Sequence, residues 1–445
     1  MISYKSEFKE TLNLAYPVII GQLGHMMMGV VDSVMVGKIG AAPLAAASVA
    51  HGLFILILIF GIGVSMALSP LVAMCIGAND LPKSGTIFRQ GLLVNFTLGV
   101  ILSLISFYAA EIILHLNQPE DVVGQAIAYM KTLGWSILPV MVFQTYRQTI
   151  EGFAIMRPAM IINILANVVN IFANWVFIFG NLGFPAMGLV GAGWATFTTR
   201  FLMALTMFSY VNFSSRFEPY GIRLNFKKID IGIIRKILRI GIPSGIQYFF
   251  EVGAFAGSAV IIGWLGTKEL AAHQIAINLA SISFMFALGI SAAAAIRVGN
   301  AVGRKEKAAT RSAGFSAILI AGSVMGCFGI LFISLRTFLP SLYINDQEVI
   351  EIAASLLIIA AGFQLSDGTQ AVGVGILRGL ADAKIPMIIT FIAYWIIGLP
   401  GGYVLGFVFN LGVQGVWIAL LIALSTSAMM LTLRFNIKSR QKIVF

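Results

Sequence analysis

Three carboxylates stand inside stretches of the sequence that are otherwise apolar: Asp32, Glu251 and Asp367. A charged group at bilayer depth costs at least ~2.5–3.5 kcal/mol on insertion scales, so such side chains face protein or water. A carboxylate in this setting can exchange a proton, or release it to a Na⁺ ion held by carboxylate and carbonyl oxygens. Either property suits a site that couples transport to a cation gradient. The alternative is a protonated, hydrogen-bonded carboxyl group with no role in transport.

Amide side chains accompany the carboxylates. Asn163, Asn167, Asn170 and Asn174 follow one another at intervals of four, three and four residues, so a helix presents all four on one face. A polar face of this kind either joins membrane helices or lines a wet cavity. We expect Asn170 and Asn174 to be partners of Asp32.

Two further amide groups are candidate polar partners in the second half of the chain. Gln274 and Asn278 form an i, i+4 pair, which places them on one helix face. Gln364 and Gln370 stand three residues before and after Asp367, so the three side chains broadly share a face.

The composition excludes a soluble protein. Of the 445 residues 59% are hydrophobic and only 11% are charged, with a mean hydropathy of +0.93. Soluble domains are roughly 45–50% apolar and about 25% charged. The net charge of +11 does not indicate nucleic acid, because the basic residues stand in short segments between apolar stretches. We therefore expect an all-α polytopic membrane protein surrounded by the lipid bilayer.

Twelve apolar stretches are long enough to cross a bilayer as helices of about 20 residues. An even number places both termini on one side. Of the 29 Lys and Arg residues, we assign all but Lys38, Lys131, Lys268 and Arg336 to the termini and to the loops after even-numbered spans, Arg147 and Arg200 included. The excess of basic residues predicts that both termini are cytoplasmic.

The sequence repeats itself with an offset of 226 residues, which aligns Pro17 with Pro243, Gly63 with Gly289, and Gly77 with Gly303. This predicts an N-terminal six-helix lobe (1–213), a basic cytoplasmic linker (214–239) and a C-terminal six-helix lobe (240–445). Because each lobe holds an even number of spans, a pseudo-two-fold axis along the membrane normal should relate the two bundles. Such a layout is typical of alternating-access transporters.

Catalytic signatures are missing from the sequence. It contains no GxxxxGK[ST] phosphate loop, no HExxH and no GxSxG, and no soluble segment long enough to bind a nucleotide. We expect no enzyme and no cofactor. The energy for transport must then come from an ion gradient or the membrane potential.

The sequence resembles the multidrug and toxic compound extrusion (MATE) transporters over nearly its whole length, and within them the NorM-like bacterial branch. The matching residues are Pro17, the run Val31-Asp32-Ser33-Val34-Met35-Val36-Gly37, Gly152, Arg157-Pro158, Gly241-Ile242-Pro243, Glu251, Leu270-Ala271-Ala272-His273-Gln274, Asn278, Asp367 and Leu377-Arg378-Gly379.

The resemblance implies a monomeric antiporter of the cytoplasmic (inner) membrane that expels organic cations and drugs in exchange for H⁺ or Na⁺. It implies that Glu251 and Asp367 bind the coupling cation, as metal ligands if that cation is Na⁺. It also implies a second polar site formed by Asp32 and the nearby Asn residues. Phe363 stands where some members carry a Tyr whose hydroxyl helps to hold the cation, so H⁺ coupling and Na⁺ coupling with other ligands both stay open.

Three other functions compete with this interpretation. A flippase for lipid-linked precursors needs a strongly basic cavity for diphosphate groups, whereas the candidate residues are acidic or amides. An intramembrane enzyme needs a catalytic constellation, which no spacing supplies. A passive channel would conduct small ions without exchange kinetics.

Overall fold

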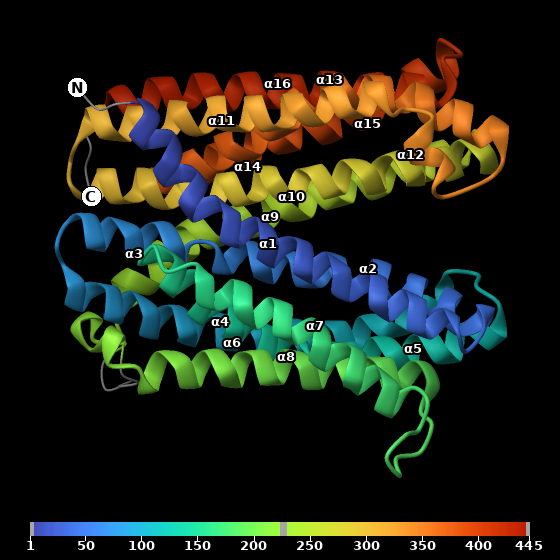
Figure 1. Cartoon of the computed structure of the whole chain (residues 1–445), viewed down its shortest axis with the longest axis horizontal. Coiled ribbons are helices and arrows are strands. Elements are labelled where there is room, and N and C mark those ends of the chain that lie inside the picture. The colour runs from blue at the N-terminus through green and yellow to red at the C-terminus, as the bar shows by residue number, and fades with distance from the viewer. Residues whose placement is uncertain (1–3, 223–228, 442–445) are drawn as a thin grey trace. The chain divides into compact units, whose positions relative to one another are not determined.

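The computed structural model describes residues 4–222 and 229–441, and within these ranges every regular element is a helix (Figure 1). This confirms the all-α fold class. The first half holds α1 (Tyr4–Gly37), α2 (Ala41–Ser65), α3 (Leu68–Gly77), α4 (Leu81–Ala109), η1 (Ala110–His115), α5 (Glu120–Trp135), α6 (Ile137–Gly152), α7 (Arg157–Phe177), α8 (Gly188–Phe213) and η2 (Ser215–Tyr220). The second half holds α9 (Ile231–Gly263), α10 (Thr267–Gly303), α11 (Lys307–Ser334), α12 (Phe338–Ser341), α13 (Gln347–Gly379), α14 (Lys384–Phe391), η3 (Ile392–Gly398), α15 (Leu399–Tyr403), η4 (Val404–Val408) and α16 (Gly412–Arg440).

Eleven helical segments of the described chain are long and apolar enough to cross a membrane. The predicted span that is not among them is α8, which has 26 residues and is long enough. Its lower hydropathy comes from Arg200 and from three threonines, at positions 196, 198 and 199. Eleven of the twelve predicted spans are thus long and apolar enough to cross the membrane, and α8 stays a predicted span.

The chain divides into two compact units, one formed by Ile20–Gly245 and the other by the residues up to Ile19 together with Ile246–Phe445. Of the predicted linker 214–239, positions 223–228 lie outside the described residues, while the rest holds η2 and the start of α9. The lobe limits 1–213 and 240–445 stay a prediction.

The unit boundaries fall at equivalent positions of the internal repeat. Ile19 and Gly245 are separated by the repeat offset, so α1 and α9 each pass from one unit into the other at the same point. Glycines that the repeat aligns make the close approaches. A Cβ on Gly63 of α2 would lie 2.6 Å from the Cα of Gly245, and a Cβ on Gly289 of α10 would lie 2.4 Å from the Cγ1 of Ile19.

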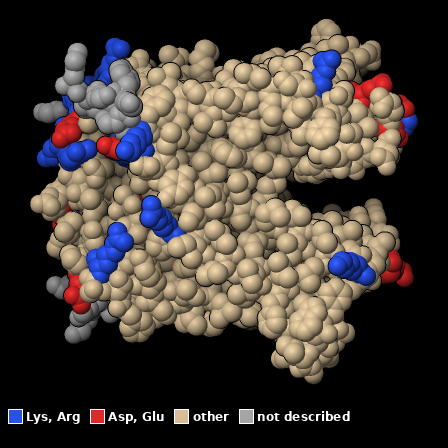
Figure 2. Space-filling view, in the orientation of Figure 1, with Lys and Arg blue, Asp and Glu red and all other residues tan. Residues whose placement is uncertain are grey.

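Each unit has its own apolar core, with Phe54 and Met141 in the first and Leu357 and Trp417 in the second. Large apolar side chains such as Leu165 and Phe172 of α7 are nevertheless exposed. Figure 2 shows most of the charged side chains on this face near the helix ends, with a largely uncharged band between them. This pattern fits helices whose outer faces contact lipid.

Candidate functional site

Glu251 and Asp367 come from different helices of one unit, each near the middle of its helix. Glu251 lies on α9 and Asp367 on α13, and both side chains are buried. The two carboxyl groups are close enough to interact electrostatically. Two buried carboxyl groups that interact in an apolar bundle form a site that can hold one or two positive charges.

Amide and hydroxyl groups surround this carboxylate pair. Gln370 lies close enough to Glu251 to interact with its carboxyl group, and its amide oxygen accepts a hydrogen bond from the Tyr394 hydroxyl at 2.9 Å. Tyr394 lies on η3, a π-helical turn, and such turns often occur at functional sites. Gln364 is fully buried, and neither its amide oxygen nor its nitrogen has a protein partner. The pair therefore has polar neighbours that can hold a proton or a small cation.

Arg378 supplies a positive charge to the same region. Its guanidinium carbon lies 5.7 Å from the centre of the Tyr248 ring, and both side chains interact electrostatically with Glu251. From the sequence, Arg378 was expected only in a family motif and among the basic residues of the cytoplasmic side, and neither Tyr248 nor Tyr394 was expected at a site. Their signal was weak, because a single Tyr in an apolar span is usually a packing residue.

The other candidate residues of this half form no hydrogen bond with the two carboxyl groups among the described residues. Phe363 packs among aromatic rings, with its ring centre 6.3 Å from that of Phe255 and 5.8 Å from that of Trp417. Gln274 is exposed and Asn278 half-buried. No hydrogen bond between described residues joins either amide to Glu251 or Asp367.

Asp32 is the centre of a second polar cluster, in the other unit. Asn174 donates hydrogen bonds to Asp32 Oδ1 at 2.6 Å and to Asn170 Oδ1 at 3.2 Å, and the Thr196 hydroxyl lies 3.4 Å from Asp32 Oδ2. Asn167 ties α7 to α1 by donating to the Gly24 carbonyl at 2.9 Å. The amide face of α7 thus points inward, while its opposite face exposes apolar side chains.

Arg200 belongs to this second cluster, which corrects its assignment to a cytoplasmic loop. It lies in the middle of α8, is only 7% exposed, and donates to the Ser136 hydroxyl at 2.7 Å. Its guanidinium carbon lies 5.4 Å from the Phe54 ring centre, and it interacts electrostatically with Asp32. Arg147 is also buried inside a helix, α6, where it forms an ion pair with Glu151 at 2.7 Å. The sequence did not indicate that Arg147 and Arg200 are buried, because a count of basic residues in each segment does not show which side chains lie inside the bundle.

Metal-binding chemistry is limited to oxygen ligands. Within residues 4–222 and 229–441 no group of three or more His, Cys, Asp or Glu side chains could hold a metal ion. A monovalent cation at Glu251 and Asp367 would therefore need amide, hydroxyl or carbonyl oxygens to complete its coordination. Gln364 and Gln370 carry such oxygens.

A bundle of membrane-spanning helices with buried carboxylates and amides at mid-helix defines a membrane transporter. The MatE family model matches residues 17–176 and again 243–404, and the two matches begin at Pro17 and Pro243, which the internal repeat aligns. The chain belongs to this family, whose members are transporters and not enzymes.

Curated relatives and solved structures agree with this assignment. The chain is 36% identical to the multidrug resistance protein NorM of Vibrio vulnificus, covering 99% of this chain and 98% of the relative. It is 34% identical to the multidrug resistance protein MdtK of Edwardsiella ictaluri, with the same coverage. The fold is similar to that of a transporter of the MOP superfamily from Pyrococcus furiosus, with a TM-score of 0.89, 21% identity, and coverage of 98% of this chain and 96% of that one.

Proposed function

We propose that this protein exports organic cations and other drugs from the cytoplasm in exchange for H⁺ or Na⁺. Membership of the MatE family and the names of its relatives, multidrug resistance proteins, support drug efflux. The observation that carries the exchange mechanism is the pair of buried carboxylates, Glu251 and Asp367, in the middle of one helical unit.

Exchange requires that the coupling cation and the drug compete, either for one site or through the conformational equilibrium. In the outward-facing state a cation from outside binds Glu251 and Asp367 and favours release of the drug. In the inward-facing state the vacated carboxylates attract a cationic drug. Gln370 and Tyr394 orient Glu251, and the unpartnered amide oxygen of Gln364 is available to a Na⁺ ion.

Asp32 forms the second polar site of the mechanism. Its hydrogen bonds to Asn174 and Thr196 fix the orientation of the carboxylate, and Arg200 balances part of its charge. The lobes 1–213 and 240–445 then act as the alternating units, the first with the half-buried Asp32 and the second with the buried Glu251 and Asp367.

The protein works in the cytoplasmic membrane with both termini in the cytoplasm, as a monomer without a cofactor. Its ligands are small-molecule drugs and the coupling ion, and it does not bind nucleic acid.

The test is efflux of a fluorescent organic cation from proteoliposomes that contain the purified protein. An imposed pH gradient and an imposed Na⁺ gradient are compared at the same membrane potential. A response to one gradient establishes antiport and identifies the ion. If intact protein responds to neither gradient, the antiport mechanism is wrong, and flipping of lipid precursors becomes the leading alternative.

A further inference from the structure

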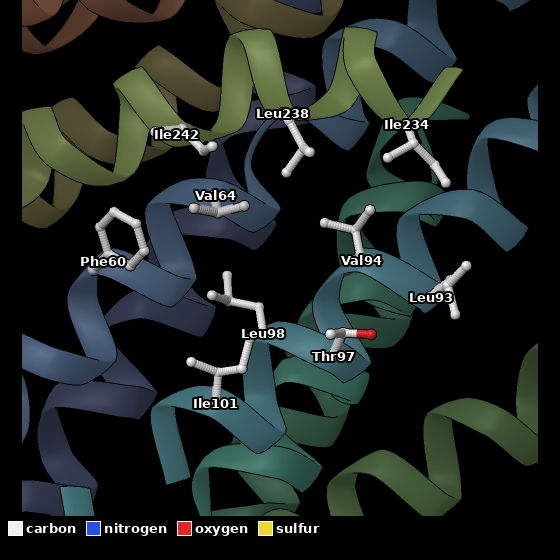
Figure 3. A pocket seen from close by; sticks show the side chains of 10 residues that line it. All are labelled: Phe60, Val64, Leu93, Val94, Thr97, Leu98, Ile101, Ile234, Leu238 and Ile242. Atoms are coloured by element: carbon white, nitrogen blue, oxygen red, sulfur yellow. The ribbon is translucent and has the colours of Figure 1, made fainter. Parts of the chain in front are cut away.

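An apolar groove of about 380 Å³ opens between α2, α4 and the first turns of α9, all within one unit (Figure 3). Ile234 and Leu93 mark one end of it, and Ile242 and Ile101 the other. Among the described residues that line it, Thr97 is the only one with a polar side chain.

Glycines explain why the groove exists. A Cβ on Gly241 would lie 2.8 Å from the Val64 carbonyl oxygen, and a Cβ on Gly245 would lie 2.7 Å from the Phe60 carbonyl oxygen. These glycines let α9 pack directly on α2. The side chains of Leu238 and Ile242 then point past α2 toward α4 without filling the space between them (Figure 3).

The groove is lined along its length by two helices and can hold part of a lipid tail. Ile234, Leu238 and Ile242 follow at i, i+4 and i+8 on α9, and Leu93, Thr97 and Ile101 repeat this spacing on α4. Eight residues of α-helix rise about 12 Å, so each wall is about 12 Å long. Both walls belong to segments that are long and apolar enough to cross the membrane.

Arginines flank the end of the groove that lies nearest the start of α9. Arg235 adjoins Ile234, Arg239 adjoins Leu238, and both side chains are exposed. Arg89 stands one turn before Leu93, where it donates to the Gly221 carbonyl at 2.6 Å. None of the described residues that line the groove is acidic. The positive charge disfavours a cationic drug as occupant and favours an anionic amphiphile.

We propose that this groove binds one acyl chain of an anionic phospholipid, whose head group lies against Arg235 and Arg239. The apolar walls favour binding of the chain through dispersion contacts. The arginines supply the preference for negative charge, as basic clusters at membrane surfaces do. Long Arg side chains reach the head-group level even from positions inside the span.

Native mass spectrometry of the purified protein tests the proposal, with phosphatidylglycerol and phosphatidylcholine of identical acyl chains as probes. The wild type should retain one phosphatidylglycerol more tightly than phosphatidylcholine, by about fivefold for each arginine. Thr97→Trp should remove that bound lipid by filling the groove. Thr97 is exposed, so folding should tolerate this substitution. Ile164→Trp, on an exposed position of α7, is the control and should retain the lipid.

The double variant Arg235→Gln, Arg239→Gln tests the head-group site separately. It should bind both lipids equally while Thr97→Trp loses both. Equal binding of the two lipids by the wild type would overturn the proposal, as would a lipid that survives Thr97→Trp. Two further results for Thr97→Trp would also overturn the proposal. Loss of dye binding would assign the groove to the drug, and loss of a dimer seen in the wild type would assign it to a second copy of the chain.

Discussion

Glu251 and Asp367 differ in their surroundings from the other acidic side chains of α13. Both are buried and close to each other, whereas Glu351, four turns before Asp367 on the same helix, is exposed and bonded only to Gln347. An exposed carboxylate is already hydrated and has no need of a coupling cation. We therefore expect the dependence of transport on the ion gradient to reside in this buried pair.

Glu251→Gln and Asp367→Asn should each reduce gradient-driven efflux to the level of liposomes without protein, because a neutral amide cannot alternate between a cation and a drug. Glu351→Gln is the control on α13 and should leave efflux unchanged. The measurement is the initial rate of dye efflux from proteoliposomes with equal protein content. Normal rates in both variants of the pair would show that coupling resides elsewhere.

The hydrogen bond from Asn174 to Asp32 should contribute to stability as well as to orientation. Removing one partner of a buried hydrogen bond costs about 1–3 kcal/mol. Asn174→Ala should therefore lower the apparent melting temperature of the detergent-purified protein. In an Asp32→Asn background the same substitution should cost less, because the two side chains form one network. Equal losses in both backgrounds would contradict a direct interaction.

At the scale of helices, the ends of α1 and α9 are tied to their units in different ways. The start of α1 is held by Arg297 of α10, which bonds Glu7 at 2.5 Å, the Thr11 hydroxyl at 2.6 Å and Glu10 at 3.1 Å. The start of α9 is held by the glycine contacts with α2. One attachment is ionic and the other is steric, so substitutions should separate them.

Glu7→Gln should destabilise the protein by about 3 kcal/mol, because it removes the buried carboxylate that pairs with the Arg297 guanidinium. Glu10→Gln is the matched control. Glu10 bonds the same guanidinium but its side chain is 65% exposed, and exposed ion pairs contribute about 1 kcal/mol or less. Thermal unfolding of the purified variants measures both. A larger loss in Glu10→Gln would reverse the assignment.

Gly63→Ala should destabilise the contact between α2 and α9 by about 1–3 kcal/mol, since its Cβ would overlap the Gly245 backbone. Gly52→Ala lies on the same helix with nothing within 4 Å of the added Cβ. It should be neutral or stabilising by up to about 1 kcal/mol. Comparable melting temperatures for the two variants would mean that α9 moves away from α2 at little cost.

The helical fold, the repeat and the amide face of α7 could be predicted from the sequence, because long apolar stretches and i, i+4 spacing have few alternative explanations. The sequence did not indicate that Arg200 lies buried inside the bundle, since the sequence pattern does not show whether a polar side chain within a span faces protein or the membrane surface. Nor did it indicate that α1 and α9 each belong to two units, because nothing in either helix interrupts the periodicity at Ile19 or Gly245. Tyr394 depends on a π-helical turn that no local motif announces.

At the scale of the whole molecule, two helices that the repeat relates, α1 and α9, each begin in one unit and continue into the other. The boundaries after Ile19 and Gly245 are equivalent in the repeat, so any change of conformation between units must pass through both helices. Each boundary follows a proline by two residues: Pro17 precedes Ile19, and Pro243 precedes Gly245. A proline leaves the carbonyl four residues before it without its helical hydrogen bond, and this weakens the helix close to the boundary.

The orientation of the chain in the membrane rests on its basic residues. Arg147 and Arg200 are buried in helices and no longer count toward it, but Arg235, Arg239, Arg304 and Lys307 remain at helix ends on the side of the termini. Both termini should therefore be cytoplasmic. Single cysteines test this in a background that lacks Cys75 and Cys327. In intact cells a membrane-impermeant maleimide should label Leu182→Cys, in the exposed turn between α7 and α8, and should leave Ser215→Cys unlabelled until the cells are lysed. The reverse pattern would invert the topology and, with it, the direction of the exchange proposed for Glu251 and Asp367.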